Sequence, residues 1–167
     1  MEGRINETLD GITTVFLDLD GTIYLGHGLI DGALEFLERL EERGIRRYFL
    51  SNNSSKSVDQ YLEKLRDLGI NADEDEVLLS THDLISWLSK KKVTNTFLVG
   101  TEGMRSMLTE RGIDASSEDP EFVVLGYDTE ITYEKLATAS IHLHRGVPMV
   151  ASHPDIVCPS PDGGLPD

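Results

Sequence analysis

Two carboxylates separated by one residue follow a short apolar run near the start of the chain. Val15-Phe16-Leu17 leads into Asp18-Leu19-Asp20, and Gly21 then ends the run. Such a run is typical of a strand buried inside a parallel sheet, and open α/β sheets bind ligands beyond the carboxyl ends of their strands. Side chains two residues apart at a strand end point the same way, so these two negative charges share one small volume. Because no basic residue is adjacent in sequence, a divalent cation such as Mg²⁺ is the expected partner of Asp18 and Asp20.

Three other interpretations of this segment are weaker or excluded. Asp-Gly after a strand often does no more than form a turn. The calcium loop of an EF-hand needs glycine at its sixth position, whereas Gly21 is the fourth residue counted from Asp18 and is soon followed by the apolar Ile23. The metal-binding Asp-x-Asp of glycosyltransferases stays open, although nothing nearby indicates a sugar-nucleotide fold.

Composition narrows the class of protein. The 167 residues are 39% hydrophobic, which suffices for one ordinary domain or two small ones. A net charge of −15, from 30 acidic and 15 basic residues, argues against nucleic acid or an anionic membrane as the main partner. No run of about 18 apolar residues and no basic-then-apolar leader is present, and the one cysteine, Cys158, has no partner for an internal disulfide. These features predict a soluble, cytoplasmic protein.

The first half of the chain alternates strand and helix patterns. After the carboxylate segment, Tyr24 to Ile30 is expected to form a flexible loop over the site. A helix follows between Asp31 and Gly44, and the next strand, Ile45 to Leu50, ends in Ser51. Ser57 with Gln60 three residues later predicts a capping box, and the helix that it opens is followed by a third short strand. This order predicts right-handed crossovers and a parallel sheet.

The second half repeats the alternation from about residue 82. Strands are expected at Thr96–Val99, Phe122–Leu125 and Val147–Ala151, with helices between them. The tail from Ser152 to Asp167, rich in proline and glycine, is expected to be a loop. The pattern therefore predicts an α/β protein with two units, residues 1–81 and residues 82–167.

Two motifs together resemble a known superfamily. Asp18-Leu19-Asp20-Gly21-Thr22 is similar to the first motif of the haloacid dehalogenase (HAD) superfamily, and Ser51-Asn52-Asn53 is similar to the second. The Ser-Asn-Asn form resembles subfamily IIA, the branch of NagD-like, 4-nitrophenyl and phosphoglycolate phosphatases. The resemblance implies a Rossmann-like parallel-sheet core, here partial, with an inserted α/β cap domain. It implies a phosphoric monoester hydrolase that depends on Mg²⁺ and works through an aspartyl-phosphate.

The resemblance also implies roles for individual residues. Asp18 would be the nucleophile and Asp20 the general acid and then base, both beside Mg²⁺. The expected phosphate-binding residues are Gly21, Thr22, Ser51, Asn52 and Asn53. In the cap, Ala151-Ser152-His153-Pro154-Asp155 makes His153 and Asp155 candidates for substrate specificity, although a polar turn set by Pro154 explains them equally well. Thr22 has an equally good interpretation as a turn-stabilising hydroxyl.

The family pattern has two further motifs that this sequence does not show. They are a lysine and a Gly-Asp with further acidic residues, whereas after residue 155 the chain has no lysine and, as acids, only Asp162 and Asp167. In the family the strand of the last motif lies beside that of the first, so Val15–Leu19 is expected to be an edge strand. By itself this chain is expected to be a weak phosphatase for small phosphate monoesters. A non-catalytic fragment or binding module, a phosphotransferase and a homodimer stay open.

Overall fold

A three-stranded parallel sheet organises the first half of the chain. The computed structural model describes residues 11–160 and 163–166. The strands are β1 (Thr14–Asp18), β4 (Arg46–Ser51) and β5 (Val77–Leu79), hydrogen-bonded in the order β1-β4-β5. The crossover helices are α2 (Ala33–Glu42) and α3 (Val58–Asp67), and a short 3-10 turn, η1 (Glu74–Glu76), precedes β5. The predicted alternation of strand and helix in this half is therefore confirmed.

Local signals in the sequence set the ends of these helices. Gln60 N donates to Ser57 Oγ at 3.4 Å and Ser57 N donates to Gln60 Oε1 at 2.9 Å, so the predicted capping box opens α3. Gly44, at φ 64°, follows the C-terminal end of α2 in the left-handed conformation that glycine adopts without strain. Both helices thus end where the chain must turn back into the sheet.

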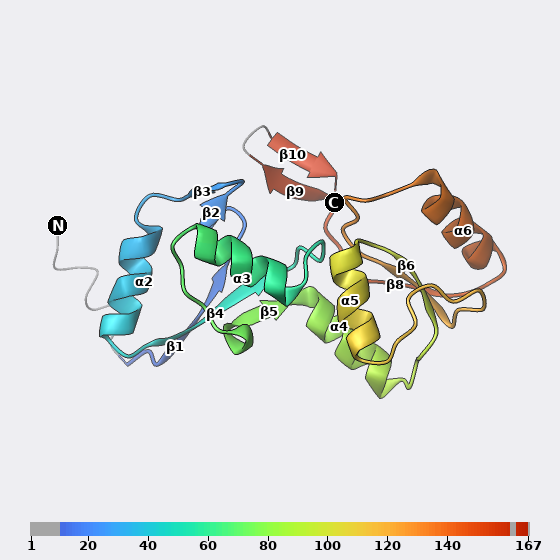
Figure 1. Ribbon diagram of the computed structural model, residues 1–167, viewed down its shortest axis with the longest axis horizontal. Helices are drawn as coiled ribbons and strands as arrows, with labels where there is room; N and C mark the ends of the chain where they lie inside the picture. The colour runs from blue at the N-terminus through green and yellow to red at the C-terminus, as the bar shows by residue number, and fades with distance from the viewer. Residues whose placement is uncertain (1–10, 161–162, 167) are drawn as a thin grey trace.

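A second parallel sheet organises the rest of the chain, beside the first (Figure 1). Its strands are β6 (Thr96–Val99), β7 (Phe122–Leu125) and β8 (Met149–Ala151), in the order β6-β7-β8. The helices of this half are α4 (Ser80–Lys90), α5 (Glu102–Glu110) and α6 (Tyr133–His144). The predicted strands and helices of this half are confirmed. The predicted boundary after residue 81 falls within α4, and the division into two domains stays a prediction.

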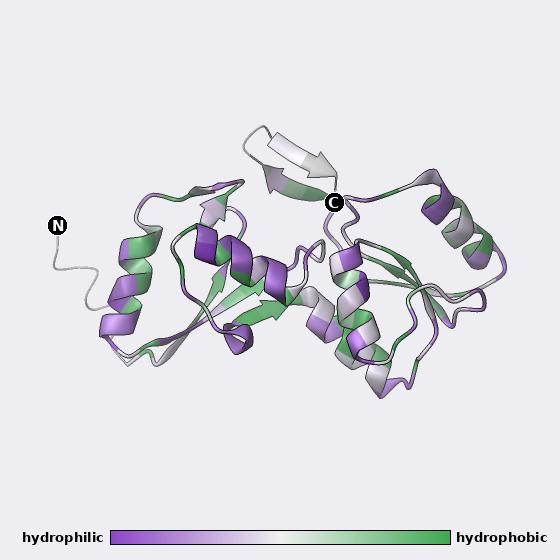
Figure 2. Ribbon diagram, in the orientation of Figure 1, coloured by the Kyte–Doolittle hydropathy of each residue, from purple (hydrophilic) through white to green (hydrophobic). Residues whose placement is uncertain are grey.

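Buried apolar side chains continue from one sheet to the other. One cluster includes Leu19 and Phe49 of the first half, Leu88 of α4, and Leu98 and Val124 of the second sheet. Figure 2 shows apolar strands in both halves, with hydrophilic residues on the outward faces of the helices. The two sheets are therefore held together by a shared apolar core as well as by the connecting chain.

Two segments that were expected to be loops form hairpins. Tyr24 to Ile30 contains β2 (Tyr24–Leu25) and β3 (Gly28–Leu29), which pair antiparallel, and Tyr24 is fully buried. The tail contains β9 (Val157–Ser160) and β10 (Gly163–Pro166), also antiparallel, and in Figure 1 this hairpin lies between the two halves. The prediction of a loop was wrong for the residues that pair in these two hairpins, because backbone pairing gives hairpins without any apolar alternation in the sequence. It holds for Ser152 to Ile156, which form no helix or strand.

One edge and one face of the first sheet are open. Within the described residues β1 pairs only with β4, as expected of an edge strand. On one face of this sheet Phe16, Leu50 and Leu78 are exposed, and Phe16 stacks on Tyr48 with ring centroids 5.4 Å apart. No helix in the described part of the chain is both long and apolar enough to cross a membrane.

Candidate active site

The first carboxylate stands at the carboxyl end of β1. Asp18 is the last residue of the strand and is exposed, while Leu19 beside it is buried in the core and anchors the turn. Gly21 adopts φ 88°, which lets the chain reverse there, and the amides of Ile23 and Tyr24 both donate to the Leu19 carbonyl. Thr22 Oγ1 donates to Asp18 Oδ2 at 3.3 Å. The turn thus holds Asp18 at the sheet edge with its carboxylate open to solvent.

The second carboxylate is partly buried against an aromatic ring and an ammonium group. Tyr24 Oη donates to Asp20 Oδ2 at 3.4 Å, and Lys64 Nζ lies 3.9 Å from Asp20 Oδ1. The same ammonium sits 3.6 Å from the centroid of the Tyr24 ring. Burial raises the pKa of Asp20 above its ordinary value, although Lys64, Lys56 and the Tyr24 hydroxyl each oppose that rise. Burial also lowers the pKa of Lys64, an effect that Asp20 opposes.

The third predicted site residue, Ser51, ends the neighbouring strand. Asp18 pairs in register with Leu50, so Ser51 stands at the same edge of the sheet as Asp18. Ser51 is buried, and its Oγ lies 2.9 Å from Tyr61 Oη and accepts from Asn53 N at 3.2 Å. Tyr61 Oη in turn donates to the Asn53 carbonyl at 3.0 Å. A helix side chain therefore fixes both the end of β4 and the loop after it.

The loop after β4 also meets the carboxyl ends of the second sheet. Thr101 Oγ1, just after β6, donates to the Ser55 carbonyl at 2.8 Å. Tyr127 N, just after β7, donates to Ser54 Oγ at 2.8 Å, and Ser152, just after β8, places its hydroxyl 2.9 Å from the same atom. Since parallel sheets present their ligand-binding edges at the carboxyl ends of the strands, the binding edges of both sheets converge on one loop.

One of the two residues predicted for specificity, Asp155, contacts this loop. Asn52 Nδ2 donates to Asp155 Oδ2, and Ser80 Oγ donates to the Asn52 carbonyl at 2.9 Å. Both ring nitrogens of His153 are buried. The structure therefore brings Asp155 against Asn52 of the predicted phosphate-binding loop. The role of either residue in specificity stays a prediction.

Three residues of the site were not singled out from the sequence: Tyr24, Tyr61 and Lys64. Tyr24 was assigned to a loop, and its burial came from a hairpin that the sequence did not indicate. Tyr61 and Lys64 lie three residues apart on α3, and Tyr61 shares its buried face with Leu65. That spacing is the one signal in the sequence that places these two polar groups toward the sheet.

Comparison with known proteins gives the family. Residues 15–114 match the model of the haloacid dehalogenase-like hydrolases, a range that contains Asp18, Asp20 and Ser51. The chain belongs to this family. It is also 36% identical over 152 residues to the acid sugar phosphatase of Staphylococcus aureus, an alignment that covers 90% of this chain and 59% of the relative. The resemblance stated from the two motifs is therefore confirmed.

Solved structures of similar proteins share the haloacid dehalogenase fold seen here. The 4-nitrophenylphosphatase of Thermotoga maritima matches with a TM-score of 0.88 and 41% identity, over 95% of this chain and 61% of that one. The glycerol phosphate phosphatase of Mycobacterium tuberculosis, in complex with magnesium, matches with a TM-score of 0.83 and 28% identity, over 93% of this chain and 48% of that one. The chain thus spans about three fifths or less of the length of these relatives.

The donor atoms at the haloacid dehalogenase motif fit a hard cation. Asp18 and Asp20 offer carboxylate oxygens, the ligand type that Mg²⁺ prefers, and the Asp18 carboxylate is exposed. The Asp20 oxygens already face Tyr24 and Lys64. Among the described residues no group of three or more histidine, cysteine, aspartate or glutamate side chains is placed to hold a metal ion.

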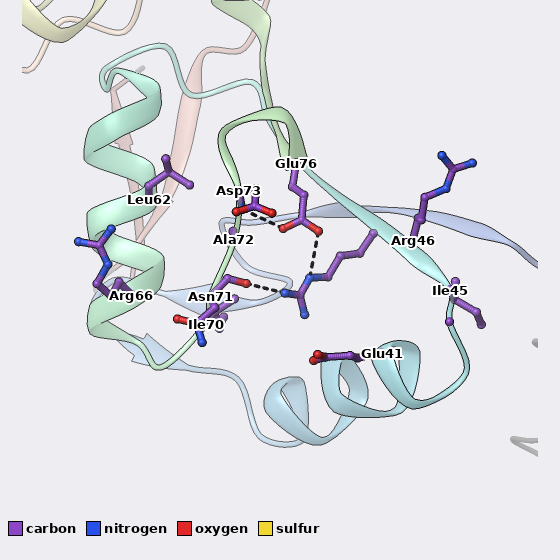
Figure 3. A pocket seen from close by; sticks show the side chains of 12 residues that line it. Glu41, Ile45, Arg46, Leu62, Arg66, Ile70, Asn71, Ala72, Asp73 and Glu76 are labelled. Atoms are coloured by element: carbon purple, nitrogen blue, oxygen red, sulfur yellow. Dashed lines mark hydrogen bonds and ion pairs between the residues drawn. The ribbon is translucent and has the colours of Figure 1, made fainter.

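One cavity in the described part of the chain lies away from this site. It measures about 620 Å³ and is lined by the end of α2, the start of β4, the end of α3 and the segment before β5 (Figure 3). These residues stand at the amino ends of the strands, opposite the edge that carries Asp18 and Ser51. Inside it Arg47 is bonded to the Asn71 carbonyl and lies 3.8 Å from Glu76. The cavity is therefore separated from the motif residues by the length of the strands.

Proposed function

We propose that this chain hydrolyses small phosphate monoesters at the carboxyl ends of β1 and β4. The observation that supports this most directly is the meeting of Asp18, Asp20 and Ser51 at one sheet edge, with one carboxylate exposed and the other partly buried. Two carboxylates in such different surroundings suit two different tasks, one as nucleophile and one as proton carrier.

In this proposal Asp18 attacks phosphorus and the ester P–O bond breaks. The leaving oxygen takes a proton from Asp20 and departs as an alcohol, which leaves the phosphoryl group on Asp18. A water molecule then attacks phosphorus and gives a proton to the Asp20 carboxylate, which releases phosphate and restores both side chains. No net proton is gained or lost by the protein over the cycle.

The surroundings of Asp20 support its part as general acid. Burial raises the pKa of its carboxyl group, which favours the protonated form that the first step needs. The Tyr24 hydroxyl and the Lys64 ammonium hold the carboxyl group in place from two sides. An acid fixed in this way transfers its proton without first having to be oriented.

Phosphate would be bound between the turn after β1 and the loop after β4. Gly21 and Thr22 would shape the site as a turn, because Gly21 N donates to the Tyr24 carbonyl at 2.7 Å and Thr22 N to the Leu19 carbonyl at 3.2 Å. The donors that we assign to phosphate are the Ser51 hydroxyl and the amide side chains of Asn52 and Asn53. The Asp18 carboxylate and an Asp20 oxygen that carries no proton would hold a bound Mg²⁺, which would supply positive charge to the phosphoryl oxygens. That charge matters here, because the chain as a whole carries −15.

The relatives support a small substrate. They are an acid sugar phosphatase, a 4-nitrophenylphosphatase and a glycerol phosphate phosphatase, names that each denote a small phosphate ester. We propose that residues 82–167 form the cap that selects among such esters, with His153 and Asp155 near the leaving group. The contact between Asp155 and Asn52 supports that placement.

Turnover of 4-nitrophenyl phosphate with millimolar Mg²⁺, compared with EDTA, tests the proposal. We expect slow hydrolysis that requires the metal. Asp20→Asn should slow hydrolysis of an alkyl phosphate about 10²-fold or more, and that of 4-nitrophenyl phosphate much less, because nitrophenolate leaves without a proton. Asp75→Asn, an exposed aspartate of η1, is the matched control and should leave both rates unchanged.

Two outcomes would contradict the proposal. Equal losses for both esters in Asp20→Asn would remove Asp20 from the role of general acid. Absence of turnover in the wild-type chain would favour the alternative, a binding module or fragment that keeps the fold without catalysis.

A further inference from the structure

A closed ring of three hydrogen bonds surrounds the Ser51 hydroxyl. Asn53 N donates to Ser51 Oγ at 3.2 Å, Ser51 Oγ lies 2.9 Å from Tyr61 Oη, and Tyr61 Oη donates to the Asn53 carbonyl at 3.0 Å. Both side chains are buried, with Ser51 5% and Tyr61 1% exposed. Water therefore has little access to the ring, and its groups satisfy one another.

The direction of each bond follows from the number of hydrogens. A carbonyl oxygen only accepts, so the one hydrogen of the Tyr61 hydroxyl goes to Asn53. The contact between Ser51 and Tyr61 is then a hydrogen bond only if Ser51 is the donor. The single Ser51 hydrogen consequently points at Tyr61, toward the interior of the protein.

This direction conflicts with the task given to Ser51 above. A phosphoryl oxygen carries no hydrogen in its anionic form, so Ser51 can bind it only by donating that same hydrogen. We infer that Tyr61 is a positioning residue whose oxygen competes with the phosphate for the Ser51 hydrogen. It holds the hydroxyl turned inward until a phosphoryl oxygen replaces it as acceptor. This inference rests on the proposed function, because it assigns Ser51 to phosphate binding.

Counting bonds gives the sign of the effect. In the wild type, phosphate binding exchanges the bond from Ser51 to Tyr61 for one from Ser51 to phosphate, so no bond is gained. In Tyr61→Phe the Ser51 hydrogen has lost its buried acceptor, and phosphate binding adds a bond. We therefore expect Tyr61→Phe to bind phosphate more tightly, by about three- to tenfold, which is the usual net effect of one hydrogen bond.

A purely structural role for Tyr61 predicts a different result. The ring lies in the core beside Leu65, and phenylalanine keeps almost all of that packing. If the hydroxyl only supports the loop through the Asn53 carbonyl, its removal would loosen the loop and weaken phosphate binding whatever stands at position 51. The two roles therefore differ in the sign of the change and in its dependence on Ser51.

The test is a double-mutant cycle on the 167-residue chain, read by titration with inorganic phosphate in the presence of Mg²⁺. The variants are Tyr61→Phe, Ser51→Ala and the double variant, each checked for folding by thermal unfolding. Tyr48→Phe, on the same β4 strand but stacked on Phe16, is the matched control and should leave phosphate affinity unchanged. If Tyr61→Phe does not fold, 4-fluorophenylalanine at position 61 keeps the volume of the hydroxyl and removes its hydrogen.

Tighter phosphate binding by Tyr61→Phe that disappears in the Ser51→Ala background supports the inference. Unchanged or weaker binding by Tyr61→Phe, or the same gain in both backgrounds, overturns it while leaving the proposed function in place. Failure of every variant, wild type included, to bind phosphate overturns the proposed site and this inference together. Equal affinity of wild type and Ser51→Ala removes Ser51 from the proposed site, and the inference falls with it.

Discussion

The two parallel sheets of this chain end at the same loop with different chemistry. At the carboxyl ends of the first stand Asp18, Asp20 and Ser51. At the carboxyl ends of the second stand Gly100 after β6 and Gly126 after β7, followed by Asp128. Both sheets therefore carry carboxylates near a strand end. Those of the first sheet lie within residues 15–114, which match the haloacid dehalogenase-like hydrolases, and Asp128 lies outside that range.

The carboxylate of the second sheet is already satisfied by the fold. The Asp128 side chain is only 2% exposed, and its Oδ2 lies 2.9 Å from Lys135 Nζ. The same ammonium donates to the carbonyls of Gly100 and Glu130 at 2.9 and 3.1 Å. Asp18, in contrast, is exposed and accepts a bond from Thr22. A carboxylate at a strand end is thus available for chemistry only where the fold leaves it open.

Removing the charge of Asp18 and, separately, of Asp128 should give the largest difference between the two sheets. Asp18→Asn should reduce phosphate ester turnover about 10⁴-fold or more, because an amide cannot attack phosphorus, and should leave the free energy of unfolding almost unchanged. Asp128→Asn should lower the free energy of unfolding by about 2 kcal/mol, because Lys135 loses its counter-charge in a buried site. The measurements are turnover of 4-nitrophenyl phosphate and urea unfolding of both variants.

Each variant is the control for the other, since both replace an aspartate by asparagine and they differ only in the sheet that carries it. Substantial turnover by Asp18→Asn would show that Asp18 is not the nucleophile. A stable Asp128→Asn would show that the ion pair with Lys135 contributes little to the fold.

The next largest effect on stability is expected where the loop after β4 packs against the carboxyl end of β7. A Cβ at Gly126 would lie 2.8 Å from Ser54 Oγ and would also collide with Met104, so Gly126→Ala should lower the free energy of unfolding by about 1–3 kcal/mol. The matched change is Gly28→Ala in the hairpin, where the nearest atom, the Leu25 carbonyl oxygen, is 3.9 Å away. Urea unfolding of the two variants measures the difference. An equal free energy of unfolding for the two variants would mean that the loop after β4 moves to accommodate the added methyl group at little cost.

The sequence carried enough information to place the two motifs together. Strands followed by crossover helices lie parallel, so the residues that end them, Asp18 and Ser51, must share an edge whatever the details of packing. The helix ends were equally local, as the capping box of Ser57 with Gln60 shows. Such features depend on the chain within a few residues of each position, and so they were predictable.

The partners of the site residues depend on contacts between distant segments. Asp155 meets Asn52 across 103 positions of sequence, and Ser152 meets Ser54 across 98. Lys64 lies 3.9 Å from Asp20 and over the ring of Tyr24, which belongs to a hairpin that periodicity did not reveal. The spacing of residues in the sequence does not predict these contacts, because each depends on how the helices and hairpins pack on the sheets.

The smallest expected effect concerns α4, the helix that leads from the first sheet to the second. His82 Nδ1 accepts from Leu79 N at 3.1 Å and so occupies one backbone donor at the start of this helix. Only the neutral ring has a lone pair at that atom. Burial lowers the pKa of His82, as does Arg111, while Glu74 opposes the change. The folded chain therefore binds this proton less readily than the unfolded chain, whose histidine has the ordinary value of about 6.5.

A histidine whose pKa is lowered by folding contributes stability at pH values above its ordinary pKa. That contribution is lost as the pH falls from the ordinary pKa toward the lower pKa of the folded state. We expect His82→Gln, whose amide oxygen can also accept from Leu79, to lose less stability than wild type between pH 7.5 and pH 5. The expected difference is about 0.5 kcal/mol, the low end for a helix cap because the imidazole is only half buried. His144→Gln, at the exposed end of α6, is the control for loss of a histidine charge. Urea unfolding at the two pH values measures the loss of stability in each protein. Equal losses in wild type and His82→Gln would show that protonation of His82 does not disturb the start of α4.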